Sequence, residues 1–177
     1  MNLILRLLRV FVAALFKPRI GLFEISEVPF RVLPTDLDIN LHMNNARYLS
    51  IMDLGRTDLL IGVGLLGPVK RERWMPVVGS IDIKYRRPLR LFQHYVLKTR
   101  LLCWDDKWFY MEQRLESARG VHSIANVRGL FVTREGSVPT RSVLDHMGYE
   151  GESPPFPRKL RPLPAREEAD ASLCSTG

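Results

Sequence analysis

The sequence has too few cysteines and histidines for a disulfide framework or a metal site. Only two of its 177 residues are cysteines, Cys103 and Cys174, and its four histidines are scattered along the chain. Neither residue type shows the short spacings of zinc or iron ligands. One pair of cysteines cannot form the disulfide framework that stabilises a small secreted domain. We therefore expect no metal and a reducing, cytoplasmic location. Any chemistry must then come from side chains alone.

Long hydrophobic runs are also absent. At the start of the chain the uninterrupted apolar run covers only residues 10–16, whereas a spanning helix needs about 20 apolar residues. No small-x-small cleavage site follows it, so we expect neither a transmembrane helix nor a signal peptide. Residues 1–16 instead predict an amphipathic helix that Pro18 ends, with Arg6 and Arg9 on one side and apolar residues on most of the rest. Two interpretations stay open: the helix packs against its own domain or an oligomer partner, or it attaches peripherally to a membrane.

The sequence has no alternation of aromatic and basic residues and no zinc-finger or RNA-binding motif. Its net charge of +7 comes largely from arginine, whose forked guanidinium suits phosphate groups. Charge alone does not choose between nucleic acid, an anionic membrane and the phosphates of a small carrier. Without a recognition motif we expect no nucleic-acid partner. Arg86 and Arg87, at the end of a predicted strand, are candidates for gripping carrier phosphates.

The hydrophobic patterns predict one strand, one buried helix and then four strands. The first strand spans residues 22–33, and its Pro29 indicates an edge position or a bulge. The helix spans 46–66 and is apolar on nearly every side, and the glycines at 62, 64 and 67 mark its exit. Turn residues separate the later segments, which therefore predict antiparallel strands at 77–85, 95–104, 108–116 and 122–133.

This order of elements predicts an α+β fold in which an antiparallel sheet wraps around a long central helix. A helix that is apolar all round must be covered, and a one-sided sheet needs a layer to cover. The predicted organisation is an amphipathic N-terminal helix at 1–20, a single domain at 21–148, and a Pro-rich tail at 149–177 that we expect to be disordered or loosely draped.

The stretch between the first strand and the helix concentrates polar residues. Within residues 36–48 it holds two carboxylates, three carboxamides and an imidazole. Residues of these types cap helices, occupy turns and transfer protons, so the stretch predicts a strand exit, a polar turn and a helix start. Capping accounts for Asn44 and Asn45, and a turn accounts for Asp36. Further along the helix, we expect Asp53 to pair with Arg56 or Arg47 rather than to face a substrate cleft.

The spacing of this stretch resembles that of the hotdog-fold thioesterases, the group that includes 4-hydroxybenzoyl-coenzyme A thioesterase and the acyl-carrier-protein thioesterases. Their common pattern is Asp-x-Asp-x-x-Gly-His-Val-Asn-Asn-x-x-Tyr. The present chain has Asp-x-Asp-x-x-Leu-His-Met-Asn-Asn-x-x-Tyr from Asp36 to Tyr48 without a gap. The resemblance covers about residues 27–147. Leu41 stands at the usual glycine, which removes the freedom for positive φ and adds a bulky side chain.

The resemblance implies hydrolysis of a thioester of coenzyme A or acyl carrier protein, with no further cofactor. Asp38 corresponds to the family's general base or nucleophile. Asp38, Asn40 and His42 are similar to the Asp-x-Asn-x-His form of the plant-type acyl-carrier-protein thioesterases. This similarity implies that Asn40 and His42 position water or carry protons. The backbone N–H groups near Asn45 and Ala46, at the start of the helix, would form the oxyanion hole.

Substrate contacts and partners follow from the same resemblance. The further candidate substrate-binding residues are Tyr48 in the motif and the two arginines Arg86 and Arg87. The family assembles as homodimers or homotetramers with the cleft between protomers, so the resemblance implies such an assembly here. A second hypothesis is a non-catalytic acyl-binding or membrane-associated hotdog protein. Leu41 and the basic amphipathic segment at 1–16 motivate that alternative.

Overall fold

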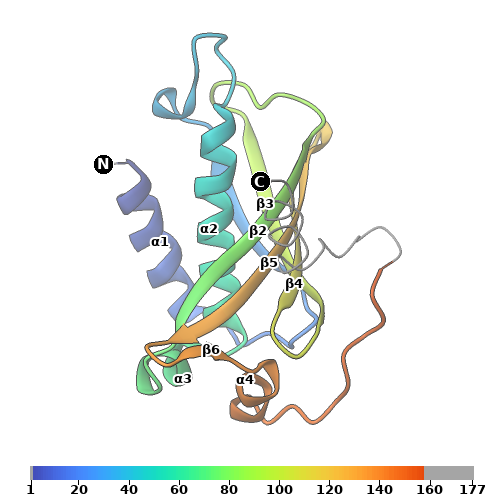
Figure 1. Ribbon diagram of the computed structural model, residues 1–177. Coiled ribbons are helices and arrows are strands. Elements are labelled where there is room, and N and C mark those ends of the chain that lie inside the picture. The colour runs from blue at the N-terminus through green and yellow to red at the C-terminus, as the bar shows by residue number, and fades with distance from the viewer. Residues whose placement is uncertain (1, 158–177) are drawn as a thin grey trace, which may run out of the picture.

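The computed structural model describes residues 2–157, and in that range an antiparallel sheet curls around one long helix (Figure 1). The strands are β1 (Ser26–Arg31), β2 (Met75–Tyr85), β3 (His94–Trp104), β4 (Phe109–Ser117), β5 (Gly120–Thr133) and β6 (Gly136–Val138). The helices are α1 (Asn2–Phe16), α2 (Asn45–Gly62), α3 (Leu66–Arg71) and α4 (Thr140–His146), with a 3-10 turn η1 (Pro34–Asp36). The order across the sheet is β1-β3-β4-β5-β2, with β6 added to β5. This architecture confirms the predicted α+β fold.

The strands form because their side chains alternate between the core and the outside. In β1 the buried residues are Ser26, Val28 and Phe30, and the residues between them are exposed. The strand pairs with β3 at one end of the sheet, and Pro29 lies opposite Val96. An edge strand tolerates proline because one side of its backbone needs no ladder hydrogen bond, so the predicted edge position is confirmed.

Helix α2 lies against the concave face of the sheet at a distance that only glycine allows. A Cβ atom on Gly55 would overlap the Leu97 side chain and lie 2.6 Å from Thr99 Oγ1. At the same level the buried Gln113 carboxamide donates to Met52 O at 2.8 Å and to Thr99 Oγ1 at 3.0 Å. The helix is therefore held to β3 and β4 both by close packing and by satisfied buried polar groups.

The helix predicted at 46–66 ends four residues earlier than expected, and a second short helix that was not predicted follows it. Helix α2 ends at Gly62, and the chain turns at Gly64, whose φ of 85° lies in the left-handed region. Helix α3 then begins at Leu66 and includes Pro68 in its first turn. A proline in the first turn has no helical hydrogen bond to lose. The glycines at 62 and 64 did mark the exit, but Gly67 and Pro68 belong to the next helix. The short elements β6 and α4 were not predicted either.

Helix α1 packs along the outside of α2, as Figure 1 shows. Its inner face carries Leu3, Arg6, Val10 and Ala14, of which the last three are buried. The two arginines predicted on one side of this helix have different environments: Arg6 is buried with its partner Asp36, whereas Arg9 is exposed. The opposite face is exposed and apolar, with Ile4, Leu5, Leu8, Val12, Leu15 and Phe16. None of the helices in the described range is long and apolar enough to cross a membrane.

The described part of the Pro-rich tail, residues 149–157, contacts the domain. Ser153 Oγ accepts a hydrogen bond from Trp104 N at 2.9 Å, and the Phe156 ring packs edge-on against Tyr110 with centroids 4.5 Å apart. These residues follow the surface instead of being disordered. The rest of the predicted tail, 158–177, lies outside the described residues.

The close approach at Gly55 makes a testable prediction for stability. We expect Gly55→Ala to lower the free energy of unfolding by about 1–3 kcal/mol through overpacking, although alanine favours a helix by about 1 kcal/mol over glycine. Gly67→Ala in α3 is the control, since no atom lies within 4 Å of the added Cβ. Urea denaturation of the two variants measures the difference, and equal effects would contradict the close approach.

Candidate active site

The motif predicted from the sequence forms a small hairpin beyond the N-terminal end of α2 (Figure 1). Leu37 and Met43 pair as an antiparallel bridge at its base. Asp38 N donates to His42 O at 2.9 Å, and Leu41 N donates to Asp38 O at 3.1 Å to close the tip. The sequence thus folds locally through its own backbone bonds into the predicted turn and helix start.

The connection between β2 and β3 holds this hairpin from the other side. His42 forms a bridge with Arg90, and Met43 N donates to Leu89 O at 2.9 Å. Leu89 N in turn donates to the Tyr48 hydroxyl at 3.3 Å. The hairpin is therefore fixed to the β2–β3 connection by backbone contacts, and this connection is fixed to α2 through the Tyr48 hydroxyl.

Asp38 uses one carboxylate oxygen for the turn and leaves the other free. Its Oδ1 accepts hydrogen bonds from Asn40 N at 2.9 Å and from His42 N at 3.3 Å. Within residues 2–157, Oδ2 has no hydrogen-bond partner, and the side chains of Asn40 and His42 have none either. Asp38 and His42 are half-buried, while Asn40 is exposed. The arrangement presents an oriented carboxylate with an available oxygen, beside an imidazole and a carboxamide that are free to contact a ligand or water.

Leu41 adopts the conformation that the usual glycine would provide. Its φ is 58°, in the left-handed region, and its side chain is 71% exposed. The sequence led us to expect that leucine would remove this conformation, but the turn retains it at a cost of about 1–2 kcal/mol relative to the right-handed region. The hydrogen bonds to Asp38 Oδ1 on either side of Leu41 help to offset that cost.

Only one of the two predicted oxyanion-hole amides is free at the start of α2. Asn44 is the N-cap, and its Oδ1 accepts a hydrogen bond from Ala46 N at 2.9 Å. Asn45 N has no partner among the described residues, so it is the amide available to a ligand oxygen. The Asn45 carbonyl accepts from the Tyr85 hydroxyl at 3.3 Å, which brings the end of β2 beside the site.

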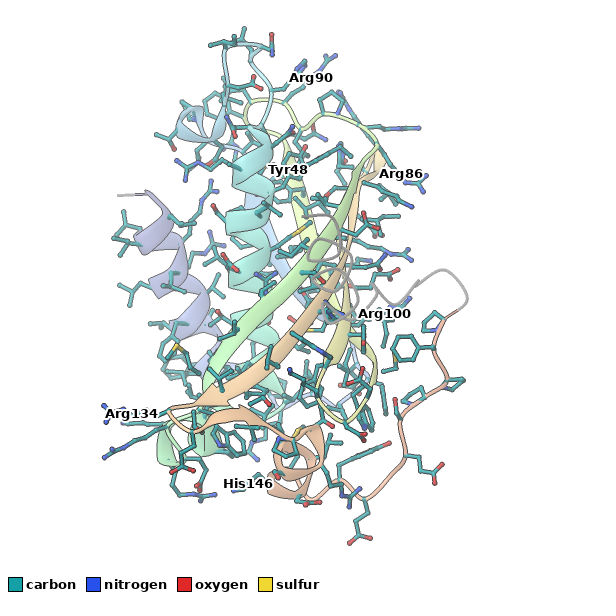
Figure 2. The ribbon with its side chains drawn as sticks, viewed as in Figure 1. Tyr48, Arg86, Arg90, Arg100, Arg134 and His146 are labelled. Carbon is teal, nitrogen blue, oxygen red and sulfur yellow. The ribbon has the colours of Figure 1, made fainter. Side chains whose placement is uncertain are left out.

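The predicted substrate-binding residues Tyr48, Arg86 and Arg87 have different environments. Tyr48 is 2% exposed, and burial raises the pKa of its hydroxyl, which anchors Leu89; in the single chain its role is structural. Arg87 Nη1 donates to Arg119 O at 2.6 Å. Arg86 is exposed, and Figure 2 shows that it extends from the same end of the molecule as the motif. Of the two arginines, Arg86 is therefore the more available to contact a ligand.

A cavity that the sequence did not reveal lies between the second half of α2 and strands β2, β3, β4 and β5. Its volume is about 320 Å³, and its wall is mostly apolar, including Leu60, Val77, Leu101, Phe131 and Met147. The polar part of the wall includes Thr57 and the ion pair between Asp53 and Arg56. The predicted pairing is confirmed, but Asp53 lines this cavity as well, which the prediction had not expected. Arg56 Nη1 also donates to Gln113 Oε1 at 2.6 Å.

Asp36 is a turn residue, as predicted: it ends the turn η1, and its Oδ2 accepts a hydrogen bond from Leu33 N at 2.9 Å. The sequence did not reveal that Asp36 is also only 1% exposed and forms an ion pair with Arg6 of α1, 2.7 Å between Oδ2 and Nη2. The one signal in the sequence is the place of Arg6 on the same helical face as Val10 and Ala14, which are otherwise core residues.

Known proteins with a similar sequence or structure show the family to which this chain belongs. The profile of the thioesterase-like superfamily matches residues 32–165. Protein THEM6 of Xenopus laevis is 36% identical over 132 residues, 73% of this chain and 62% of that protein. The chain spans less than two thirds of the length of the first curated relatives that it matches.

Two solved structures show the same fold. The probable thioesterase YbaW from Escherichia coli has a TM-score of 0.64 at 23% identity, over 69% of this chain and 95% of its own. Protein SAV2348 from Staphylococcus aureus, solved in complex with CoA, has a TM-score of 0.62 at 16% identity, over 83% of this chain and 98% of its own. With a hotdog fold, the motif hairpin at the start of its central helix and a superfamily profile that covers most of its length, this chain belongs to the thioesterase-like superfamily.

Proposed function

We propose that this protein is an acyl thioesterase that hydrolyses a thioester of coenzyme A or acyl carrier protein. The observation that carries the proposal is the Asp38 carboxylate, held by two backbone amides through Oδ1 with Oδ2 free, near the uncapped Asn45 amide. Membership of the thioesterase-like superfamily supports the reaction class. The CoA-bound Staphylococcus aureus protein of the same fold supports coenzyme A as the carrier.

The proposed reaction uses Asp38 as a general base. Asp38 Oδ2 takes a proton from a water molecule, whose oxygen attacks the thioester carbonyl. The negative charge that develops on the carbonyl oxygen is stabilised by Asn45 N at the positive end of α2. The C–S bond then breaks, and the thiolate receives a proton from Asp38, directly or through His42, to give a free carboxylic acid and a thiol. Asn40 would position the water, and direct nucleophilic attack by Asp38 is the alternative first step.

The acyl chain needs an apolar site that a single protomer does not place beside Asp38. The α2 residue of the cavity wall that is nearest to the motif is Asp53, and the eight helical residues from Asn45 to Asp53 correspond to about 12 Å. Arg86 and Arg90, at the motif end, suit the phosphates of the carrier. The two parts of a substrate site therefore lie at different levels along α2.

We propose that a homodimer joins these parts. Strand β2 lies at the end of the described sheet, pairs only with β5, and is long and largely exposed. Such an edge is a template for pairing with another strand. An isologous antiparallel pairing centred on Ser80 would bring Tyr85 beside Met75 of the other protomer. The motif of one protomer would then face the cavity of its partner, and a homotetramer would contain two such pairs.

The role of Asp38 is tested by Asp38→Asn. Asparagine keeps an Oδ1 acceptor for the turn but cannot act as a base, so we expect kcat to fall by about 10²–10⁴-fold with unchanged stability. Thiol release from a panel of acyl-coenzyme A substrates measures the rate. Asp145→Asn, on the surface of α4, is the control and should keep the wild-type rate. Unchanged turnover in Asp38→Asn would exclude Asp38 as the base.

The shared site is tested by pairing two inactive variants. Asp38→Asn removes the base, and Leu60→Trp fills the cavity; each homodimer should be inactive. A heterodimer purified through two different tags contains one intact site, so we expect about half of the wild-type activity per dimer. An inactive heterodimer would place base and cavity in one protomer. Failure to isolate any heterodimer would contradict the dimer.

A second candidate function, a non-catalytic acyl-binding or membrane-associated protein, is favoured by the outer face of α1. This face exposes Leu5 by 61%, Leu8 by 58% and Phe16 by 86%, and Arg9 is exposed beside them. An exposed apolar helix face with adjacent basic residues suits the interface of an anionic membrane. Such attachment is also compatible with catalysis.

Membrane attachment is tested by the double substitution Leu5→Glu and Leu8→Glu. We expect at least about tenfold weaker partitioning to vesicles that contain anionic lipid, because two large side chains no longer insert. Arg134→Glu, at the other end of the molecule, lowers the net charge by the same amount and is the control. Co-sedimentation measures the bound fraction. Equal losses of vesicle binding in the two variants would indicate that binding depends on net charge alone. No binding by the wild type would exclude membrane attachment.

A further inference from the structure

Helix α1 is joined to the motif hairpin by a buried, two-pronged ion pair. Arg6 Nη2 lies 2.7 Å from Asp36 Oδ2, and Nη1 lies 3.3 Å from Oδ1. The Arg6 and Asp36 side chains are only 10% and 2% exposed. Arg6 Nη2 also donates to Arg31 O at the end of β1, at 2.9 Å. The planar fork of arginine thus connects α1 to β1 and to the first residue of the motif.

Asp36 also forms hydrogen bonds that connect the ion pair to both ends of the hairpin. Its Oδ2 accepts from Leu33 N at 2.9 Å, and its carbonyl accepts from Asn44 N at 2.8 Å. Asn44 caps α2, and Asp38 follows Asp36 by two residues. The position of Asp36 therefore sets where the hairpin starts and where the helix with the free amide begins.

A second cation near Asp36 is too distant to replace Arg6. Arg47 Nε lies 4.0 Å from Asp36 Oδ1, and the Arg47 side chain is 34% exposed. Its Nη2 donates instead to Thr35 O at 3.2 Å. Without Arg6, the buried carboxylate would keep only a backbone amide and a long, partly solvated ion pair. A buried charge in that situation is unstable, and the surrounding chain is expected to rearrange.

We propose that Arg6 is a positioning residue for the active site, which it orders through Asp36, and that α1 is thereby part of the catalytic architecture of this chain. The inference rests on the proposed function, because it assigns Arg6 a role in placing Asp38 and the start of α2. Helix α1 lies before residue 32, where the superfamily match begins. Arg6 therefore lies outside the matched region, whereas its partner Asp36 lies within it.

The other end of α1 provides a matched control. Lys17, one residue beyond α1, pairs with the buried Asp58 at 3.0 Å, and Ser26 Oγ donates to the same carboxylate at 2.7 Å. Lys17 lies eleven residues after Arg6, or about 16 Å along a helix. Loss of either cation weakens the docking of α1, but only loss of Arg6 acts on the hairpin.

The experiment compares Arg6→Met with Lys17→Met in the full chain. We expect Arg6→Met to lower kcat by about 10–100-fold through misplaced catalytic groups, with KM changed less than about twofold because the cavity is untouched. Lys17→Met should keep the wild-type kcat. Arg6→Lys, which keeps the charge but not the fork, should recover part of kcat. Equal kcat values for Arg6→Met and Lys17→Met would overturn the proposal.

Hydrogen–deuterium exchange separates this proposal from the proposed function. Peptides that cover residues 36–46 should exchange about tenfold faster in Arg6→Met than in Lys17→Met, whether or not any substrate is turned over. If the wild type hydrolyses no thioester but this difference is present, the proposed function fails and the ordering role of Arg6 stands. If exchange is the same in both variants, Arg6 does not order the hairpin. Should Arg6→Met not fold, the comparison is made with Arg6→Lys, and the same outcomes apply.

Discussion

The buried carboxylate of Asp36 is the constraint on which the arrangement of the site depends. A carboxylate that is 1% exposed is stable only with full compensation of its charge, which can amount to several kcal/mol. The compensation comes from Arg6 on α1 and from Leu33 N after β1, while the carbonyl of the same residue binds the N-cap of α2. Helix, strand, hairpin and cap therefore meet at one residue, and none of them can move without exposing or unpairing that charge.

The two acidic residues of the motif have different roles because their environments differ. Asp36 is buried and paired, so it is unsuited to exchange protons with a substrate. Asp38, two residues later, is half-buried, and it divides its oxygens between the turn and the open side of the hairpin. Under the proposed function, this contrast would separate a structural carboxylate from a catalytic one. The backbone amide of Asn45, which has no partner among the described residues, lies at the start of α2.

Periodicity and turn residues predicted the main elements closely, since these depend on local patterns. The strand expected at 95–104 is observed at His94–Trp104, and the helix start expected near Asn45 is observed there. Features that depend on distant residues were not predictable. Arg6 and Asp36 are thirty residues apart, and the cavity combines α2 with residues of β2, β3, β4 and β5. The use of the Ala46 amide by the cap of its own helix, which removes it from the predicted oxyanion hole, also became visible only in the structure.

The substitution of leucine for the usual glycine acts on the surface beside Asp38 and not on the turn. Had Leu41 taken a right-handed conformation, the hairpin would have had a different path and Asp38 a different orientation. The observed φ of 58° and the paired backbone groups of Asp38 and His42 show that the path is retained. What changes is the side chain, which is 71% exposed next to Ile39 at 97%. The hairpin tip thus presents apolar surface where glycine would leave backbone open. Under the proposed function, this surface would limit which acyl group or carrier can approach the Asp38 carboxylate, while the position of that carboxylate stays the same.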